Sequence, residues 1–129
     1  MNNFLYLVWY EKEKKILNLI AKITYENNCY RFEYLNFNTN ELQLFSKNGL
    51  YYGFMDINEI YESDKLFPTI LNRLPSKKRV DYDKIMKMFN FSEDATDFEI
   101  LEKTKGINSN DKFRFITEDE YNELRKEIN

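Results

Sequence analysis

Residues 16–34 read ILNLIAKITYENNCYRFEY, and their pattern predicts the centre of a β-sheet. Its first half alternates apolar side chains with others, which is typical of a strand with one buried face. In its second half, Tyr30, Phe32 and Tyr34 alternate with charged residues in the same way. Asn27-Asn28 lies between the halves and can adopt the positive φ that a tight turn needs. The stretch therefore predicts two antiparallel strands.

The residues before this stretch extend the predicted sheet. Residues 5–10 are rich in β-branched and aromatic side chains, which favour strands. The charged residues 11–15 follow and are typical of a hairpin loop. The first third of the chain is thus predicted to be an antiparallel meander. By the two-residue period of a strand, one sheet face should carry Leu17, Leu19, Ala21, Ile23, Tyr30, Phe32 and Tyr34.

Helix signals begin in the middle of the chain. Residues 39–46 are predicted to form a short helix that ends at Lys47-Asn48-Gly49. Asp56 is predicted to cap a turn, and Asp64 to cap a second helix that ends at Pro75. The apolar stripe of that second helix would be Leu66, Phe67, Ile70, Leu71 and Leu74.

The last third is predicted to be helical except for one strand. Asp81 should cap a helix whose apolar residues recur at i, i+3, i+4 and i+7. Capping-box sequences at Thr96 and Thr117 open two further helices, and Gly106 ends the first of these. Residues 113–116 should form a short strand that returns to the sheet. The residues expected to cover the sheet are Ile85, Met86, Phe89, Ile100 and Leu101.

Together these signals predict an α+β fold, in which an amino-terminal antiparallel β-meander packs against several short carboxy-terminal helices and a late strand returns to the sheet. A length of 129 residues suits one domain, and no repeat or Pro/Gly-rich linker divides residues 1–129. Aromatic residues make up 17% of the chain, which argues against disorder.

No apolar run is long enough to span a membrane, and the start lacks the basic segment of a signal peptide. We therefore expect a cytoplasmic protein.

The residues needed for most catalytic chemistry are scarce. The chain has no histidine, which removes the commonest general base and the commonest metal ligand. Three glycines are too few for a phosphate-binding loop, and the one cysteine, Cys29, is expected to be a small buried hydrophobe. We expect no enzyme activity, no metal, no cofactor and no small-molecule substrate. Carboxylates that lie close in sequence are interpreted as solvated surface: Glu11 and Glu13, Glu93 and Asp94, and Glu118 and Asp119.

A cluster of cations is the first candidate for a binding site. Arg73, Lys77, Lys78 and Arg79 lie within residues 73–80, which contain no acid. The cluster is either an anion contact, to phosphate or to an acidic partner, or a solvated loop between two helices. The net charge of −3 argues against a nucleic-acid partner.

An aromatic segment is the second candidate. Residues 50–68 are crowded with apolar groups but show weak periodicity. Tyr51, Tyr52 and Phe54 are therefore either core residues or anchors of a partner-binding patch. Aromatic side chains suit such anchors because they offer a large contact area with few rotors.

The order of motifs in the second half of the chain is distinctive. Residues 71–75 read LNRLP, a predicted helix ends in MFNF at residues 88–91, and residues 93–101 read EDATDFEIL. Gly106 and the strand at residues 113–116 follow. This order resembles the amino-terminal subdomain of HipA-type toxin kinases. In that subdomain a β-meander precedes a Leu-Leu-Pro segment, an acidic helix and a glycine loop that enters a strand.

The resemblance spans the meander and these later motifs, and it carries functional implications. The family loop usually has two adjacent glycines where this chain has one, and nothing here resembles the kinase core. In tripartite modules of this family the subdomain is a free-standing antitoxin, HipS, of a separate kinase. The resemblance thus implies a non-catalytic protein-binding module. Such a module would be an antitoxin-like or regulatory partner of a HipA-type kinase toxin or a defence protein.

A second resemblance gives the alternative function. Residues 61–68, YESDKLFP, and residues 79–82, RVDY, are similar to the region that precedes HIRAN domains in some bacterial proteins. On this alternative the chain is an accessory domain of a HIRAN-type DNA-binding protein, and it is either a fragment of a longer protein or a region that works alone.

Overall fold

The computed structural model describes residues 3–35, 51, 53–54, 56–92 and 94–128. Several sequence predictions fall elsewhere. The helix expected at residues 39–46 with its end at residues 47–49, the side chain of Tyr52 and the carboxylate of Glu93 lie outside the described residues.

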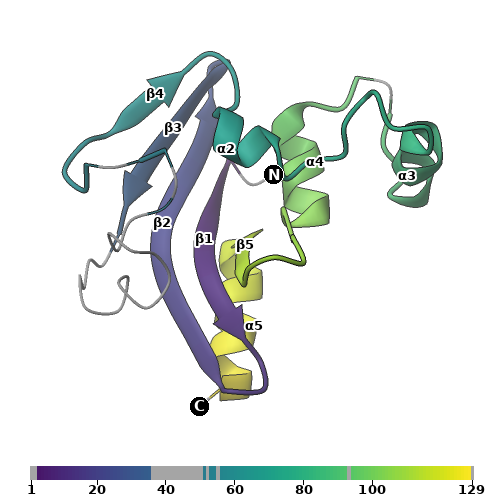
Figure 1. Cartoon of the computed structure of the whole chain (residues 1–129). Coiled ribbons are helices and arrows are strands. Elements are labelled where there is room, and N and C mark those ends of the chain that lie inside the picture. The colour runs from purple at the N-terminus through teal and green to yellow at the C-terminus, as the bar shows by residue number, and fades with distance from the viewer. Residues whose placement is uncertain (1–2, 36–50, 52, 55, 93, 129) are drawn as a thin grey trace.

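The described part of the chain forms one antiparallel sheet with four helices, as the sequence predicts (Figure 1). The strands are β1 (Phe4–Glu11), β2 (Ile16–Glu26), β3 (Cys29–Tyr34), β4 (Tyr61–Ser63) and β5 (Phe113–Ile116). Their order across the sheet is β4-β3-β2-β1-β5, and every neighbouring pair is antiparallel. The amino-terminal meander and the late strand that pairs with β1 are therefore confirmed. Only β4 is unexpected, because a three-residue strand carries too little periodicity to recognise.

The four helices are α2 (Pro68–Leu71), α3 (Tyr82–Met88), α4 (Asp97–Thr104) and α5 (Glu118–Ile128). Both predicted capping boxes are present. The Thr96 hydroxyl accepts from the Glu99 amide at 3.1 Å, and the Thr117 hydroxyl accepts from the Glu120 amide at 3.1 Å. Lys105 is the C-cap residue of α4. Gly106 follows it directly and has a φ of +58°, as predicted for a helix end.

Two predicted caps are wrong in detail. Asp64 does not begin a helix, because α2 starts at Pro68 after Phe67, without a capping side chain. Pro68 sets the backbone for a first helical turn, and so replaces the cap. Asp81 does occupy the cap position of α3, but its carboxylate binds Arg79 instead of a helix amide.

The predicted sheet face is wrong for Leu17 and Leu19, because β2 contains a bulge. Leu7 pairs with Ala21 but Val8 pairs with Leu19, so Ile20 is an extra residue in β2. An extra residue reverses which side chains face each side of the sheet beyond it. Ala21 therefore shares one face with Ile23, as expected, whereas Leu17 and Leu19 lie on the opposite face with Val8 and Tyr10.

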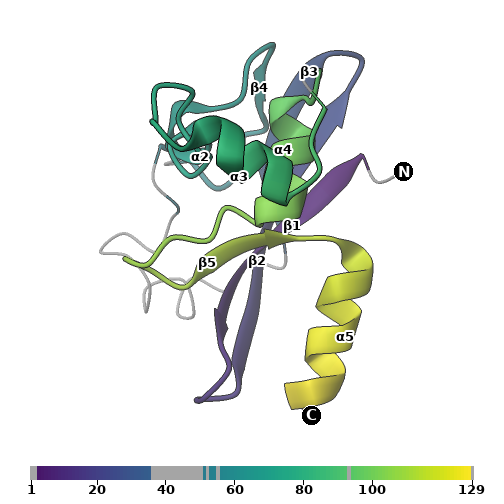
Figure 2. The same cartoon turned by 90° about the vertical axis from the view of Figure 1, so that its right-hand side faces the viewer.

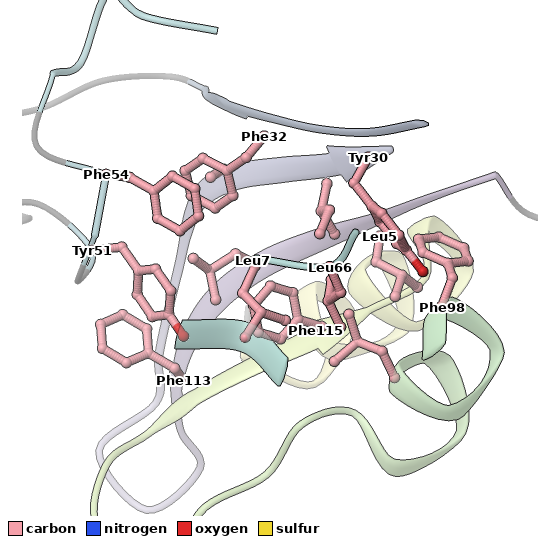
Figure 3. Close-up of a cluster of buried hydrophobic side chains, with 14 of the residues drawn as sticks. Leu5, Leu7, Tyr30, Phe32, Tyr51, Phe54, Leu66, Phe98, Phe113 and Phe115 are labelled. Atoms are coloured by element: carbon pink, nitrogen blue, oxygen red, sulfur yellow. The ribbon is translucent and has the colours of Figure 1, made fainter. Parts of the chain in front are cut away.

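Each face consequently has its own apolar cluster. The larger core lies between one sheet face and the segment that contains α2 and α4, and it includes the rings drawn in Figure 3. The smaller cluster lies on the opposite face and is covered by Tyr121, Leu124 and Ile128 of α5. In Figure 2 this last helix runs along the lower part of the sheet, away from α2 and α4.

Only some of the residues expected to cover the sheet do so. Ile100 and Leu101 of α4 are buried in the larger core, as predicted. Met86 is half-buried and packs against that core, but Phe89 is 37% exposed. None of the residues of α3 is buried. Ile85 is half-buried but belongs to neither apolar cluster. The prediction for α3 therefore holds for Met86 and is wrong for Ile85 and Phe89.

The half-buried hydroxyl group of Tyr34 on β3 links the sheet to the segment above it. The Tyr34 hydroxyl donates to the carbonyl oxygen of Phe54 at 2.5 Å and accepts from the Tyr51 amide at 3.0 Å. Tyr30 on the same strand stacks on Tyr25 with ring centroids 4.4 Å apart. Burial raises the pKa of both the Tyr30 and the Tyr34 phenol.

These phenols predict a loss of stability in alkali. An unfolded tyrosine ionises near pH ~10, whereas Tyr30 and Tyr34 hold their protons to higher pH in the folded chain. The unfolded state therefore binds fewer protons above pH ~10, so the stability that these groups confer is complete below that pH and falls as the pH rises. Urea titrations at several alkaline pH values should show a shallower fall of the unfolding free energy with pH for Tyr34→Phe than for the wild type. Equal slopes would contradict this assignment.

Candidate interaction surface

The segment between α2 and α4 stands apart from the rest of the fold. We call residues 76–92 the arm; they include α3 and the turns on either side of it. In Figure 1 the helix of the arm lies on the far side of α4 from the sheet. Figure 2, turned by a quarter, shows the same helix in front of α2 and α4. The arm is thus a projection on the helical side of the molecule.

Apolar side chains on the arm face solvent. Val80 is fully exposed, and Met88 is 72% exposed. Phe89 follows directly and, with 37% of its surface exposed, is also open to solvent. Scattered single apolar residues are normal on a protein surface, whereas contiguous ones mark an interaction site, and Met88 and Phe89 are adjacent in the chain.

The arm has a defined backbone in spite of this exposure. Asn90 has a φ of +58°, its amide donates to the Lys87 carbonyl at 3.1 Å, and the Phe91 amide donates to the Met86 carbonyl at 3.0 Å. This pair of bonds is the Schellman motif that ends many helices. Met86 and Phe91 pack against the larger core. The arm is therefore attached at its carboxy-terminal end and shows its remaining apolar residues outward.

Two clefts separate the arm from α4. One has a volume of about 430 Å³ and is lined by Leu71, Leu74 and Tyr82 among others. The other has a volume of about 600 Å³. Four aromatic rings line the larger cleft, and two carboxylates stand beside them: Tyr25, Phe89, Phe91, Phe98, Glu99 and Glu102. The space beneath the arm is therefore partly apolar and open to a partner.

The four cations of the predicted cluster lie in different environments in the structure. Lys77 and Lys78 are exposed on the arm. Arg79 is on the arm too, but it forms a two-pronged pair with Asp81, with nitrogen–oxygen distances of 2.9 Å. The Arg79 guanidinium holds the pKa of the Asp81 carboxyl below its usual value. Of the cations of the cluster that lie on the arm, Lys77 and Lys78 are thus the ones available to bind an anion.

Arg73 is not an anion contact, which corrects the sequence prediction. Its side chain is 5% exposed and pairs with Asp111. It also donates to the Tyr51 hydroxyl at 2.8 Å and to the Gly106 carbonyl at 3.0 Å. Although burial alone would lower the pKa of the guanidinium, the bonds to Asp111 keep that pKa raised. Arg73 is a structural residue that joins three segments distant in sequence.

The prediction for the aromatic segment is also wrong in part. Tyr51 and Phe54 are each 2% exposed, so the expectation that they present a partner-binding patch is wrong for these two. Phe54 stacks on Phe32 at 3.8 Å between ring centroids, and Tyr51 meets Phe113 edge-on at 4.9 Å (Figure 3). Their core role is the alternative that the sequence left open. Tyr52 lies outside the described residues.

Other features of the described residues bear on metal binding, membrane insertion and thiol chemistry. Within the described ranges, no three His, Cys, Asp or Glu side chains are grouped so that they could hold a metal ion. No helix of the described chain has the length and apolar character to cross a bilayer. Cys29 is half-buried instead of buried as predicted, and its thiol lies 3.6 Å from the Tyr30 carbonyl oxygen.

Comparisons with family models, with curated proteins and with solved structures find no match for this chain. The arm is therefore the candidate binding surface of this chain. Sequence reasoning missed its exposed apolar residues, because Val80 lies in a charged turn and Phe89 fits the apolar spacing of a core helix. The one available signal was a helix of two turns flanked by cations, which is too short to be stable through local interactions alone.

Proposed function

We propose that this chain is a non-catalytic protein-binding module that acts as an antitoxin-like or regulatory partner of a HipA-type kinase toxin or a defence protein. It needs no metal, cofactor or small-molecule substrate for this role. The single observation that carries the proposal is the arm, a projecting helix with Val80, Met88 and Phe89 exposed. The resemblance of the sequence to the HipA amino-terminal subdomain supplies the class of partner.

The energetics of the arm favour a partner over free solvent. Burial of apolar surface contributes about 25 cal/mol per Å², so covering the side chains of Met88 and Phe89 would stabilise a complex by a few kcal/mol. Methionine adapts its shape to varied surfaces, and aromatic rings are common anchors of interfaces. A short helix held at one end loses little further freedom on docking, which reduces the cost of binding.

The test is binding to the HipA-type kinase of the same genome. Met88→Asp should weaken binding by about 1–4 kcal/mol, because it places a charge where an apolar contact forms. Isothermal titration calorimetry of wild-type chain and variant against the purified kinase measures this difference. The variant should melt within a few degrees of the wild type, since Met88 is exposed and outside both apolar clusters.

Ile60→Asp is the matched control. Ile60 is 51% exposed and precedes β4, at the sheet edge farthest from the arm in Figure 1. The substitution makes the same change of charge and polarity on an exposed apolar residue, so it should leave binding unchanged. The absence of binding by the wild type, or equal losses for the two variants, would contradict the proposal.

A further inference from the structure

The arm differs in charge from the rest of the chain. Residues 76–92 contain five cations and two carboxylates, a net charge of +3, whereas the whole chain has a net charge of −3. One of the five cations, Arg79, pairs with Asp81. Among the described residues, the other four have no carboxylate within ion-pair distance: Lys77, Lys78, Lys84 and Lys87.

Some of these lysines lie near the exposed apolar residues along the chain. Lys84 and Met88 are four residues apart on α3, so they lie on the same face of the helix. Lys87 is three residues after Lys84 and therefore also its neighbour, which places two like charges side by side. Lys78 precedes Val80 by two residues in the turn before the helix. Apolar contact and positive charge are thus combined on one surface.

We propose that the partner of the arm is a protein with an acidic surface around an apolar pocket. This inference rests on the proposed function and states the chemistry of the partner. Acidic side chains would neutralise the adjacent lysines, and the pocket would take Met88 and Phe89. Complementary charge of this kind raises the rate of encounter and sets specificity, while the buried apolar anchor supplies most of the affinity.

A protein fits this surface better than a nucleic acid. Nucleic-acid binders usually carry more positive charge than the arm does, and the whole chain has a net charge of −3. Sequence-independent DNA contacts need little apolar surface, whereas Val80 and Met88 are the most exposed large apolar residues of the described chain. The experiment below therefore also tests whether the arm binds duplex DNA.

The experiment is a selection of random peptides displayed on phage against the wild-type chain, followed by binding measurements on synthetic copies of the enriched peptides. We expect these peptides to combine Asp or Glu with Leu, Phe or Met. Their affinity should fall about tenfold or more for the double variant Lys84→Glu/Lys87→Glu. It should also fall as salt is raised above ~0.15 M, because exposed charges are screened. A short duplex DNA serves as the second probe and should not bind.

Lys12→Glu/Lys112→Glu is the matched control, because both lysines are exposed, lie away from the arm and give the same change of net charge. It should leave peptide affinity unchanged. Enriched peptides that lack acids, or that bind the Lys84/Lys87 variant as tightly as the wild type, would overturn the acidic partner. In that case the proposed function still stands if Met88→Asp abolishes their binding. No enrichment, insensitivity to Met88→Asp, or tight binding of the duplex DNA would overturn both.

Discussion

Replacing Phe32 with alanine should lower the free energy of unfolding by about 3–5 kcal/mol, the cost of removing a buried aromatic side chain. Phe32 is fully buried at the centre of the larger core. Its ring stacks on Phe54 at 3.8 Å and meets Tyr34 edge-on at 5.3 Å between centroids (Figure 3). The substitution removes these contacts and leaves a cavity that the sheet cannot close. Urea denaturation measures the change.

Phe89→Ala is the matched control for Phe32→Ala. Phe89 is also a phenylalanine predicted from sequence to cover the sheet, but it lies on the arm and is partly exposed. Its replacement should cost well under half as much as that of Phe32. Similar losses for the two variants would show that the face assignment or the exposure of the arm is wrong.

Replacing Arg73 with methionine should be about as damaging, at about 3–5 kcal/mol, because it breaks a buried ion pair from one side. Asp111 would lose its partner while remaining 85% covered, and the Gly106 carbonyl would lose the donor that now reaches it at 3.0 Å. The apolar replacement keeps most of the volume of the side chain, so the loss reports the unpaired groups more than a cavity. Thermal or urea unfolding would measure it.

Two further variants separate charge from packing. Arg73→Met combined with Asp111→Leu should recover part of the loss, because no buried charge is then left unpaired. Arg79→Met breaks an ion pair of similar geometry on the exposed arm and should leave the midpoint of unfolding nearly unchanged. If Arg73→Met were as harmless as Arg79→Met, the structural role of Arg73 would be refuted.

Local sequence patterns predicted much of the secondary structure. Period-two alternation located β2 and β3, and the density of β-branched and aromatic residues located β1. The capping boxes at Thr96 and Thr117 located two helix starts. All of these signals depend on residues close in sequence. The bulge at Ile20 could not be predicted, since an extra residue in β2 depends on how β1 pairs with it. It sends Leu17 and Leu19 to the opposite face.

The candidate site was only partly accessible to sequence reasoning, for a related physical reason. A buried arginine and an exposed one look alike in sequence. Arg73 and Arg79 differ because Asp111, 38 positions away, reaches the first and not the second. In the same way, the spacing of Met86 and Phe89 fits a core helix, and only the packing of α4 against the sheet decides that α3 is left outside.

Amide hydrogen exchange of the chain, alone and bound to the HipA-type kinase, tests most directly whether the arm is the binding surface. In the free chain the amides of α3 should exchange faster than those of β1 and β2, since the helix is short and none of its residues is buried. On binding, we expect strong new protection within residues 76–92, with little change in the central strands. Protection confined to other surfaces, such as α5 or the edge at β4, would show that the arm is not the binding surface.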